Sequence, residues 1–482
     1  MPRLLAPFIG RPLSRRLVSD IETRIVQRYR RRGRPFVQVS LPEQEVDQGV
    51  LTVRVVEFHL GKIKVEGVSP KAATDLAQAI RRQRDGGIDT GRLSQDLDWL
   101  NRDPFRNLTA SFAPGTSVGA TDLTLTATQA RRWQVFAGYA DSGAPSTGQD
   151  RYFVGASAEI IPAMGAVLSL QVTGSPDFWA DRGELFGQSS PLYRSASGRL
   201  DLPITSRQAL DISLDAEESN FGGALFSSRQ QTVEASAIYR AALSNLVPAP
   251  GDVSLGVEAR RQTRQTYFGG LAVAGASVGV YQLLLGWTGD EQDRFGRSTI
   301  DLNIHVSPGH FNASNTNAAL AQFSLGRVRG ASYGYAHFNF SRTTDLPHGL
   351  TLATQLTGQY ADQAIPNSEQ FAIGGVYAVR GYSLDDGAYD DGLILRDELR
   401  AQGPPLIQLA NLIIEQPFLF GDLGHARDYI AQRALTIGSV GVGGSLRFGR
   451  ASASLSFGDP LADGPSTRVG RWRADIRVEA TY

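Results

Sequence analysis

The chain has 482 residues with 48 basic and 48 acidic side chains, so its net charge at pH 7 is zero and gives no reason to expect nucleic acid as a partner. It contains no cysteine, which excludes disulfides, thiolate zinc sites and cysteine nucleophiles, and its six histidines have no paired metal-ligand spacing. With these residues absent or scattered, we expect no metal site, and we expect no cofactor. No run of 18 apolar residues occurs, so we also expect no helix that crosses a bilayer.

The chain begins with MPRLLAPFIGRPLSRR, which carries basic residues too early and too short an apolar run for a secretory signal. Residues 14–33 then place apolar side chains at helical spacing, and Gly33 ends the segment as a C-terminal cap would. Two alternating runs, 37–41 and 51–55, are joined by the polar PEQEVDQG and predict two strands. The apolar positions of the helix are Val18, Ile21, Ile25 and Tyr29.

Residues 59–128 continue with a strand, two helices and two more strands. Ser69 and Pro70 have the pattern of an N-cap followed by proline at the first helical position. The pattern predicts a β-α-α-β-β module, and residues 1–57 look like the later part of another module that lacks its opening strand. We therefore expect that residue 1 lies inside a longer gene product or is a misassigned start, with a signal peptide and the missing strand encoded upstream.

From about Arg131 onward, apolar and polar residues alternate. The clearest run is RWRADIRVEATY at 471–482, whose apolar face begins and ends with an aromatic residue. A soluble sandwich also alternates, so the pattern alone does not decide between the two classes. Similar runs are found at 210–215, 300–305 and 451–457.

Three features favour a membrane barrel over a sandwich. The strands are about ten residues long, which suits a tilted strand that crosses a bilayer. Short connections alternate with long ones, and the polar face is heavily charged, as a wet lumen would be. The number of candidate strands is about sixteen. The short connections are PAMG after residue 161, PITSR after 202, DLPHG after 344 and Gly449-Arg450.

Two motifs lie in the last third of the chain. The longest connection, 362–390, contains FAIGGVYAVRGYSLDDG, with VRGY at 379–382, and FGDLG follows at 420–424. With YRRRGRPFVQVSLPEQEVDQG and LDWLNRDPF near the start, the chain resembles the two-partner secretion transporters (TpsB; the ShlB/FhaC/HecB family) of the outer-membrane assembly protein superfamily.

This resemblance, together with the pattern, predicts α+β periplasmic POTRA modules followed by an all-β, 16-stranded antiparallel transmembrane β-barrel. The first, truncated module is expected at 1–57, the second at 58–130, and the barrel at 131–482 with loop 362–390 folded inward. The resemblance implies a bacterial outer-membrane protein that works as a monomer in outer-membrane lipid. Its POTRA modules would capture a large exoprotein of the haemolysin or adhesin type for secretion, with no enzymatic reaction.

The resemblance also implies a site. In the family, the arginine of the loop between the eleventh and twelfth barrel strands pairs with the aspartate of F-x-D-x-G on the wall, here Arg380 and Asp422. A guanidinium can bind a carboxylate as a bidentate fork. The run from Leu409 to Phe420 is apolar on both faces, so the sequence leaves the face of Asp422 open, and an exposed turn arginine remains an alternative. The matching residues are Val379, Arg380, Gly381 and Tyr382 on the loop and Phe420, Asp422 and Gly424 on the wall.

The stretch LRDEL adds Glu398 and Arg396 as secondary candidates that face the lumen, although Asp397 interrupts the apolar side of that strand. The acidic DDGAYDDG at 385–392 lacks the closing glutamate of an EF-hand loop, and a solvated loop is the preferred interpretation over a calcium site. GTSVG at 115–119 and GASVG at 275–279 match G-x-S-x-G, but neither leads into a helix, which argues against a serine hydrolase.

The arginine-rich end of the first helix, with Arg28, Arg30, Arg31 and Arg32, is interpreted as its solvated side, not as a nucleic-acid site.

Three other functions stay open. An assembly insertase of the same superfamily would share both motifs, a plain porin would explain the barrel but not the modules, and a soluble enzyme would need the alternating faces to pack into a core.

Overall fold

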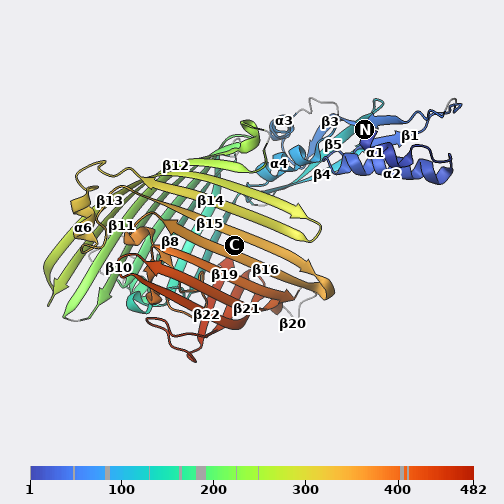
Figure 1. The fold of residues 1–482 in the computed structure, drawn as a ribbon. Coiled ribbons are helices and arrows are strands. Elements are labelled where there is room, and N and C mark those ends of the chain that lie inside the picture. The colour runs from blue at the N-terminus through green and yellow to red at the C-terminus, as the bar shows by residue number, and fades with distance from the viewer. Residues whose placement is uncertain are drawn as a thin grey trace. The chain divides into compact units, whose positions relative to one another are not determined.

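The computed structural model describes residues 2–46, 49–81, 87–129, 131–161, 165–180, 191–223, 225–247, 249–401, 407–409 and 412–482. They form two compact units, the first built mainly from residues up to Arg132 and the second from Trp133 onward (Figure 1). Of the helices in these ranges, none is both long enough and apolar enough to cross a membrane.

The first unit begins with a helix packed on a two-stranded antiparallel sheet. Ser14 caps the long helix, because its Oγ accepts a hydrogen bond from the Leu17 amide at 3.1 Å. The predicted helix and strands are confirmed, but the second strand starts at Arg54, since Leu51 and Val53 pack against the helix without joining the ladder. The elements are α1 (Pro2–Leu5), η1 (Ala6–Phe8), α2 (Arg15–Arg30), β1 (Val37–Ser40) and β2 (Arg54–Glu57).

The second part of this unit has the β-α-α-β-β order that the sequence predicts. Its sheet has the order β3-β5-β4, with β3 parallel and β4 antiparallel to β5, and both helices bury apolar side chains on it. GTSVG forms the turn between the last two strands and leads into no helix. The elements are β3 (His59–Glu66), α3 (Pro70–Ala79), α4 (Thr90–Leu100), β4 (Arg106–Pro114) and β5 (Ala120–Gln129).

The second unit is a closed antiparallel barrel (Figure 1). β20 continues β19 along β21, so the described residues give sixteen strands, and the last pairs with the first, with Val478 opposite Tyr139. The predicted 16-stranded barrel is confirmed. The strands are β6 (Trp133–Ala140), β7 (Arg151–Ile161), β8 (Ala166–Gly174), β9 (Tyr193–Thr205), β10 (Gln208–Gly222), β11 (Phe226–Ala242), β12 (Asp252–Phe268), β13 (Leu271–Asp293), β14 (Gly296–Ser307), β15 (Tyr333–Leu346), β16 (Leu350–Ala361), β19 (Asp391–Ala401), β20 (Ile407–Leu409), β21 (Leu412–Asp428), β22 (Arg433–Phe448), β23 (Ala451–Pro460) and β24 (Arg473–Thr481).

Alternation along the strands separates an apolar outer face from a polar inner face. On β14, Ile300, Leu302 and Ile304 are exposed on the outside. His305, the next residue, faces inward, where its Nδ1 lies 3.2 Å from the Glu258 carboxylate. A wet, charged interior surrounded by an apolar exterior is typical of a barrel in a bilayer.

Two details of the prediction are wrong. Several strands are much longer than ten residues, with 23 in β13 and 17 in β12. These two strands stay paired up to the tight turn at Gly269–Gly270, so strand residues take the place of a long loop. Short helices also occur in the barrel's connections, namely α5 (Pro176–Ala180) and α6 (Asn317–Phe323).

The tight connections agree with the prediction at Gly449-Arg450, whereas in PITSR only Ser206 and Arg207 form the turn and the first three residues belong to β9. In DLPHG the turn is the 3-10 segment η4 (Pro347–Gly349). Of PAMG, residues 162–164 lie outside the described residues.

Candidate functional site

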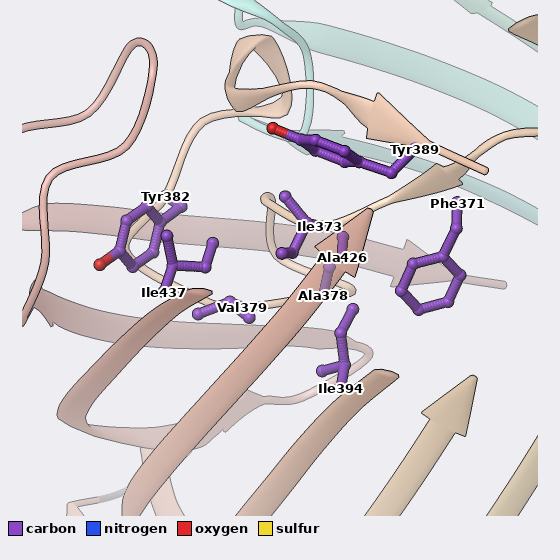
Figure 2. Close-up of a cluster of buried hydrophobic side chains, with 9 residues drawn as sticks. All are labelled: Phe371, Ile373, Ala378, Val379, Tyr382, Tyr389, Ile394, Ala426 and Ile437. Carbon is purple, nitrogen blue, oxygen red and sulfur yellow. The ribbon is translucent and has the colours of Figure 1, made fainter. Parts of the chain in front are cut away.

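Segment 362–390, between β16 and β19, lies against the inner face of the barrel wall. Figure 2 shows apolar side chains of this segment around Ile394 of β19, Ala426 of β21 and Ile437 of β22. The long connection is therefore packed as a small core inside the barrel. Its members from the segment, each less than one tenth exposed, are Phe371, Ile373, Ala378, Val379, Tyr382 and Tyr389.

The face of Asp422, which the sequence left open, is the inner one. On β21, Leu419 and Leu423 point outward and are 58% and 54% exposed. Asp422 has the opposite parity in the strand and is 4% exposed. The wall motif F-x-D-x-G thus presents its three named residues to the lumen.

Arg380 is 3% exposed and is held by two carboxylates. Its Nε donates to Asp422 Oδ2 at 2.8 Å and its Nη2 donates to Asp422 Oδ1 at 2.7 Å, which together form a bidentate fork. The Arg380 backbone N–H also donates to Asp422 Oδ2, at 3.0 Å. The remaining Nη1 donates to Glu398 Oε1 at 2.5 Å.

An aromatic ring completes this contact. The Arg380 guanidinium carbon lies 3.7 Å from the centre of the Phe420 ring, so the planar guanidinium stacks on the face of the ring. A lysine ammonium is not planar and would cover less of that ring. Burying a charge is costly unless it is paired and hydrogen-bonded, and here each charged group is both. Arg380 is therefore not an exposed turn arginine.

The two secondary candidates on β19 differ in their contacts. Glu398 bridges the loop and the wall, because its other oxygen accepts from Arg400 Nε at 2.8 Å. Arg396 lies beside the pair, with its Nε 3.9 Å from Asp422 Oδ2 and without a hydrogen-bond partner in the described part of the chain. Asp397 does not disturb this register, since it points outward and accepts from Thr354 Oγ1 at 2.5 Å.

Two glycines permit the close approach of loop and wall. A Cβ added to Gly424 would lie 2.7 Å from a methyl carbon of Val379 and 3.0 Å from Ile373. Gly381 has a φ of +83°, which favours glycine, and a Cβ there would lie 3.1 Å from the backbone of Gly458 on β23. The glycines of both motifs are thus explained by packing.

Tyr382 fixes the loop through its hydroxyl group. The side chain is fully buried, and its hydroxyl oxygen lies 3.0 Å from the carbonyl oxygen of Gly438 and 2.7 Å from that of Ala462, so its one proton can be donated to either. The ring packs in the same cluster as Val379 (Figure 2). All four residues of VRGY therefore contact the wall or the loop following β23.

The solvated interpretation of DDGAYDDG is wrong. The carboxylate of Asp386, in the 3-10 turn η6 (Leu384–Asp386), accepts from the Thr467 backbone at 2.9 Å and from the Ser466 backbone at 2.7 Å. Asp390 is fully buried, and both of its oxygens lie 2.7 Å from Arg327 Nη2. Sequence reasoning missed these contacts because each partner lies in a different loop.

The start of the segment has a further anchor that sequence reasoning also missed. Glu369, at the end of η5 (Asn367–Glu369), forms an ion pair with Arg260 of β12 and accepts from Tyr335 Oη at 2.8 Å. An acidic residue in a loop expected inside the lumen was the available signal. In the described ranges, no three His, Cys, Asp or Glu side chains are grouped to hold a metal ion.

Family models match most of the chain. The model described as "Haemolysin secretion/activation protein ShlB/FhaC/HecB" matches residues 119–448, and the model for the ShlB-type POTRA domain matches residues 1–57. The haem/hemopexin transporter protein HuxB of Haemophilus influenzae (strain 86-028NP) is 19% identical over 470 residues, which cover 95% of this chain and 78% of HuxB. The outer membrane transporter CdiB of Dickeya dadantii is 24% identical over 486 residues, covering 95% and 79%.

Solved structures share the fold. CdiB from Escherichia coli superposes with a TM-score of 0.77 at 18% identity, over the whole of this chain and 87% of that structure. CdiB from Acinetobacter baumannii gives a TM-score of 0.68 at 16% identity, over the whole of this chain and 86% of that structure. With the match over residues 119–448, the chain belongs to the haemolysin secretion/activation family ShlB/FhaC/HecB, whose members are outer-membrane transporters that secrete partner exoproteins and have periplasmic POTRA modules.

Proposed function

We propose that this chain secretes one large partner exoprotein and that segment 362–390 is the element that must move during passage. The observation that supports this most directly is the fork between Arg380 and Asp422, at 2.7 and 2.8 Å, inside the barrel. The segment covers the inner face of β19, β21 and β22, so an exported chain cannot use that part of the lumen while the segment is in place. Its ties are ion pairs, hydrogen bonds and apolar packing, all non-covalent, so they can reopen.

The POTRA modules would select the exoprotein before it enters the barrel. A sheet edge presents unpaired backbone groups to which an extended peptide can add as a further strand. In the second module, β3 and β4 are the outer strands of the three-stranded sheet. Either edge offers backbone recognition that does not depend on the exact sequence of the exoprotein.

Transport in this scheme needs no bond-breaking reaction and no cofactor, and one chain is sufficient. The barrel closes on itself through β24 and β6, so a single copy encloses the passage. Folding of the exported chain outside the cell would give direction to its movement, and no nucleotide-binding loop is found in the sequence.

The experiment compares a deletion strain complemented with the native chain, Arg380→Ala or Arg329→Ala. Arg329 is exposed and serves as the matched control. Mass spectrometry of the culture supernatant should show that deletion removes one large protein and that the native chain and Arg329→Ala restore it, whereas Arg380→Ala gives an altered amount of that protein at equal barrel levels in the outer membrane.

Two outcomes would contradict the proposal. If deletion instead lowers many outer-membrane proteins together, the chain is an assembly insertase. If no secreted protein changes and only small-solute permeability falls, it is a porin. Unchanged secretion by Arg380→Ala alone would leave transport intact but remove the role proposed for the loop.

A further inference from the structure

The outer face of strands β9 to β12 carries a charged cluster where its apolar band ends. On β12, the outward residues Val253, Leu255, Val257 and Ala259 are followed by Arg261. The neighbouring strand β11 changes in the same way, from Val233 to Gln231 and Arg229. The cluster consists of Arg194 on β9, Glu218 and Asn220 on β10, Gln231 and Arg229 on β11, and Arg261 on β12.

The register places these residues side by side on one face. Glu218 lies opposite Gln231, and Arg229 lies opposite Asn220 one pair further along. Arg261 lies opposite Val233, which is 50% exposed on the outside of the barrel. The cluster therefore faces the membrane surroundings and not the lumen.

The cluster lies toward the cell surface. The chain passes from the periplasmic modules into β6, so β6 runs outward and the following strands alternate in direction. β12 is the seventh strand and runs outward from Asp252 to Phe268, so Arg261 lies in its outer half. The charged positions thus begin at the outer edge of the apolar band, where a bilayer gives way to headgroups.

Glu218 organises the cluster. Its Oε2 accepts from Arg194 Nη2 at 3.0 Å, from Arg229 Nη2 at 2.7 Å and from Gln231 Nε2 at 2.8 Å. The glutamate and Arg194 side chains are each 6% exposed, so two guanidinium groups are held in fixed positions by one buried carboxylate. Preorganised in this way, they lose little freedom when they bind a further anion.

The cluster has donors that its one glutamate does not occupy. Arg194 and Arg229 both pair with Glu218, and Arg261 adds a positive charge on the same face. Arg261 is exposed and forms no ion pair with the described part of the chain, and Arg229 keeps a buried Nε without a hydrogen-bond partner in the same ranges. Guanidinium donors at a headgroup boundary suit a phosphate, which they bind in a fork.

We propose that this cluster, named here the outer arginine cluster, binds a phosphate of the phosphorylated glycolipid in the outer leaflet of the outer membrane. The depth and the sign of the charge both favour this lipid, since its phosphates lie on sugars at the level where the apolar band ends. The inference rests on the membrane location of the barrel and is independent of how the exoprotein is transported.

The test measures binding to the full chain in detergent by native mass spectrometry, with diphosphoryl lipid A as the probe. The double variant Arg229→Gln/Arg261→Gln should bind about 30-fold more weakly, the effect of two basic side chains near an anionic surface. Arg342→Gln is the matched control and should bind as the native chain does. Arg342 is also on the outer face, but at the periplasmic end of β15, where it contacts Asp293.

A second variant distinguishes binding from a purely structural role. Glu218→Gln removes the competing negative charge and should tighten binding about fivefold, whereas loss of local structure would weaken it. Dephosphorylated lipid A should not bind at this site. Equal binding by the native chain and the double variant, weaker binding by Glu218→Gln, or equally tight binding of inorganic phosphate or phosphatidylglycerol would overturn the proposal.

Discussion

Removing the loop arginine should release segment 362–390 from the wall. In Arg380→Ala, the buried Asp422 loses the cation that forks onto it, with Arg396 left 3.9 Å away, and Glu398 keeps only Arg400. Breaking a buried ion pair by deleting one partner costs about 3–5 kcal/mol. The population of the displaced segment should therefore rise at least a hundredfold, taking about 1.4 kcal/mol per factor of ten.

The lack of cysteine in the chain permits a clean assay of this displacement. Ala378 belongs to the buried cluster of Figure 2, so Ala378→Cys reacts with a maleimide only when the segment opens. The labelling rate should rise at least about a hundredfold when Arg380→Ala is added. Arg380→Lys keeps the charge but loses the fork, worth about 1.5–3 kcal/mol, and should fall between the two.

Two controls make this prediction decisive. Arg329→Ala changes an exposed arginine and should leave the labelling rate as it is. The double variant Arg380→Ala/Asp422→Asn leaves one fewer buried charge uncompensated, so its effect should be smaller than the sum of the single effects. If Arg380→Ala labels no faster than Arg329→Ala in barrels that still show heat-modifiable migration, the ion pair does not hold the segment.

Two further predictions use matched pairs of variants. Gly424→Ala places a Cβ 2.7 Å from Val379 and should destabilise the docked segment by about 1–3 kcal/mol, measured as faster labelling of Ala378→Cys. Gly421→Ala, on the same strand with nothing within 4 Å of the added Cβ, should leave the labelling rate unchanged. Equal labelling rates of the two variants would refute the packing argument. Arg327→Ala leaves the buried carboxylate of Asp390 without its cation and should lower the barrel's free energy of unfolding by about 3–5 kcal/mol, measured as a lower melting temperature. The exposed Arg329→Ala should leave the melting temperature unchanged. Equal melting temperatures of the two variants would show that the Arg327–Asp390 pair does not stabilise the barrel.

The barrel could be predicted from the sequence because alternation is a local property of each strand. The exception is β21, where the run up to Phe420 is apolar on both faces. The structure supplies the reason: Phe418 and Phe420 face the lumen but lie beside the Arg380 guanidinium, with its carbon 5.7 Å and 3.7 Å from their ring centres. Where a loop covers the inner wall, the wall is no longer wet, and the polar half of the pattern is lost.

The anchors of the segment could not be predicted, because their partners are remote in sequence. Asp390 is separated from Arg327 by 63 positions, and Glu369 from Arg260 by 109. A run of four aspartates with glycine and tyrosine has the composition of a solvated loop, and only the folded barrel shows that Asp386, Asp390 and Asp391 are buried acceptors. The strand extensions were missed for a similar reason, since nothing in their local pattern marks where the bilayer ends.

The contacts at Asp422 also bear on what could replace the segment during transport. Displacing it entirely would break the pairs at Arg380, Asp390 and Glu369, at a cost well above the thermal energy. Under the proposed function, the passing exoprotein must therefore make contacts that favour the open state, because a ligand shifts an equilibrium only by its differential affinity. An extended chain presents a backbone N–H about every 3.3 Å, and Asp422 already accepts one from Arg380 at 3.0 Å. The Asp422 carboxylate, which holds the loop, can therefore accept a hydrogen bond from a backbone N–H of an unfolded chain, whatever the sequence of that chain.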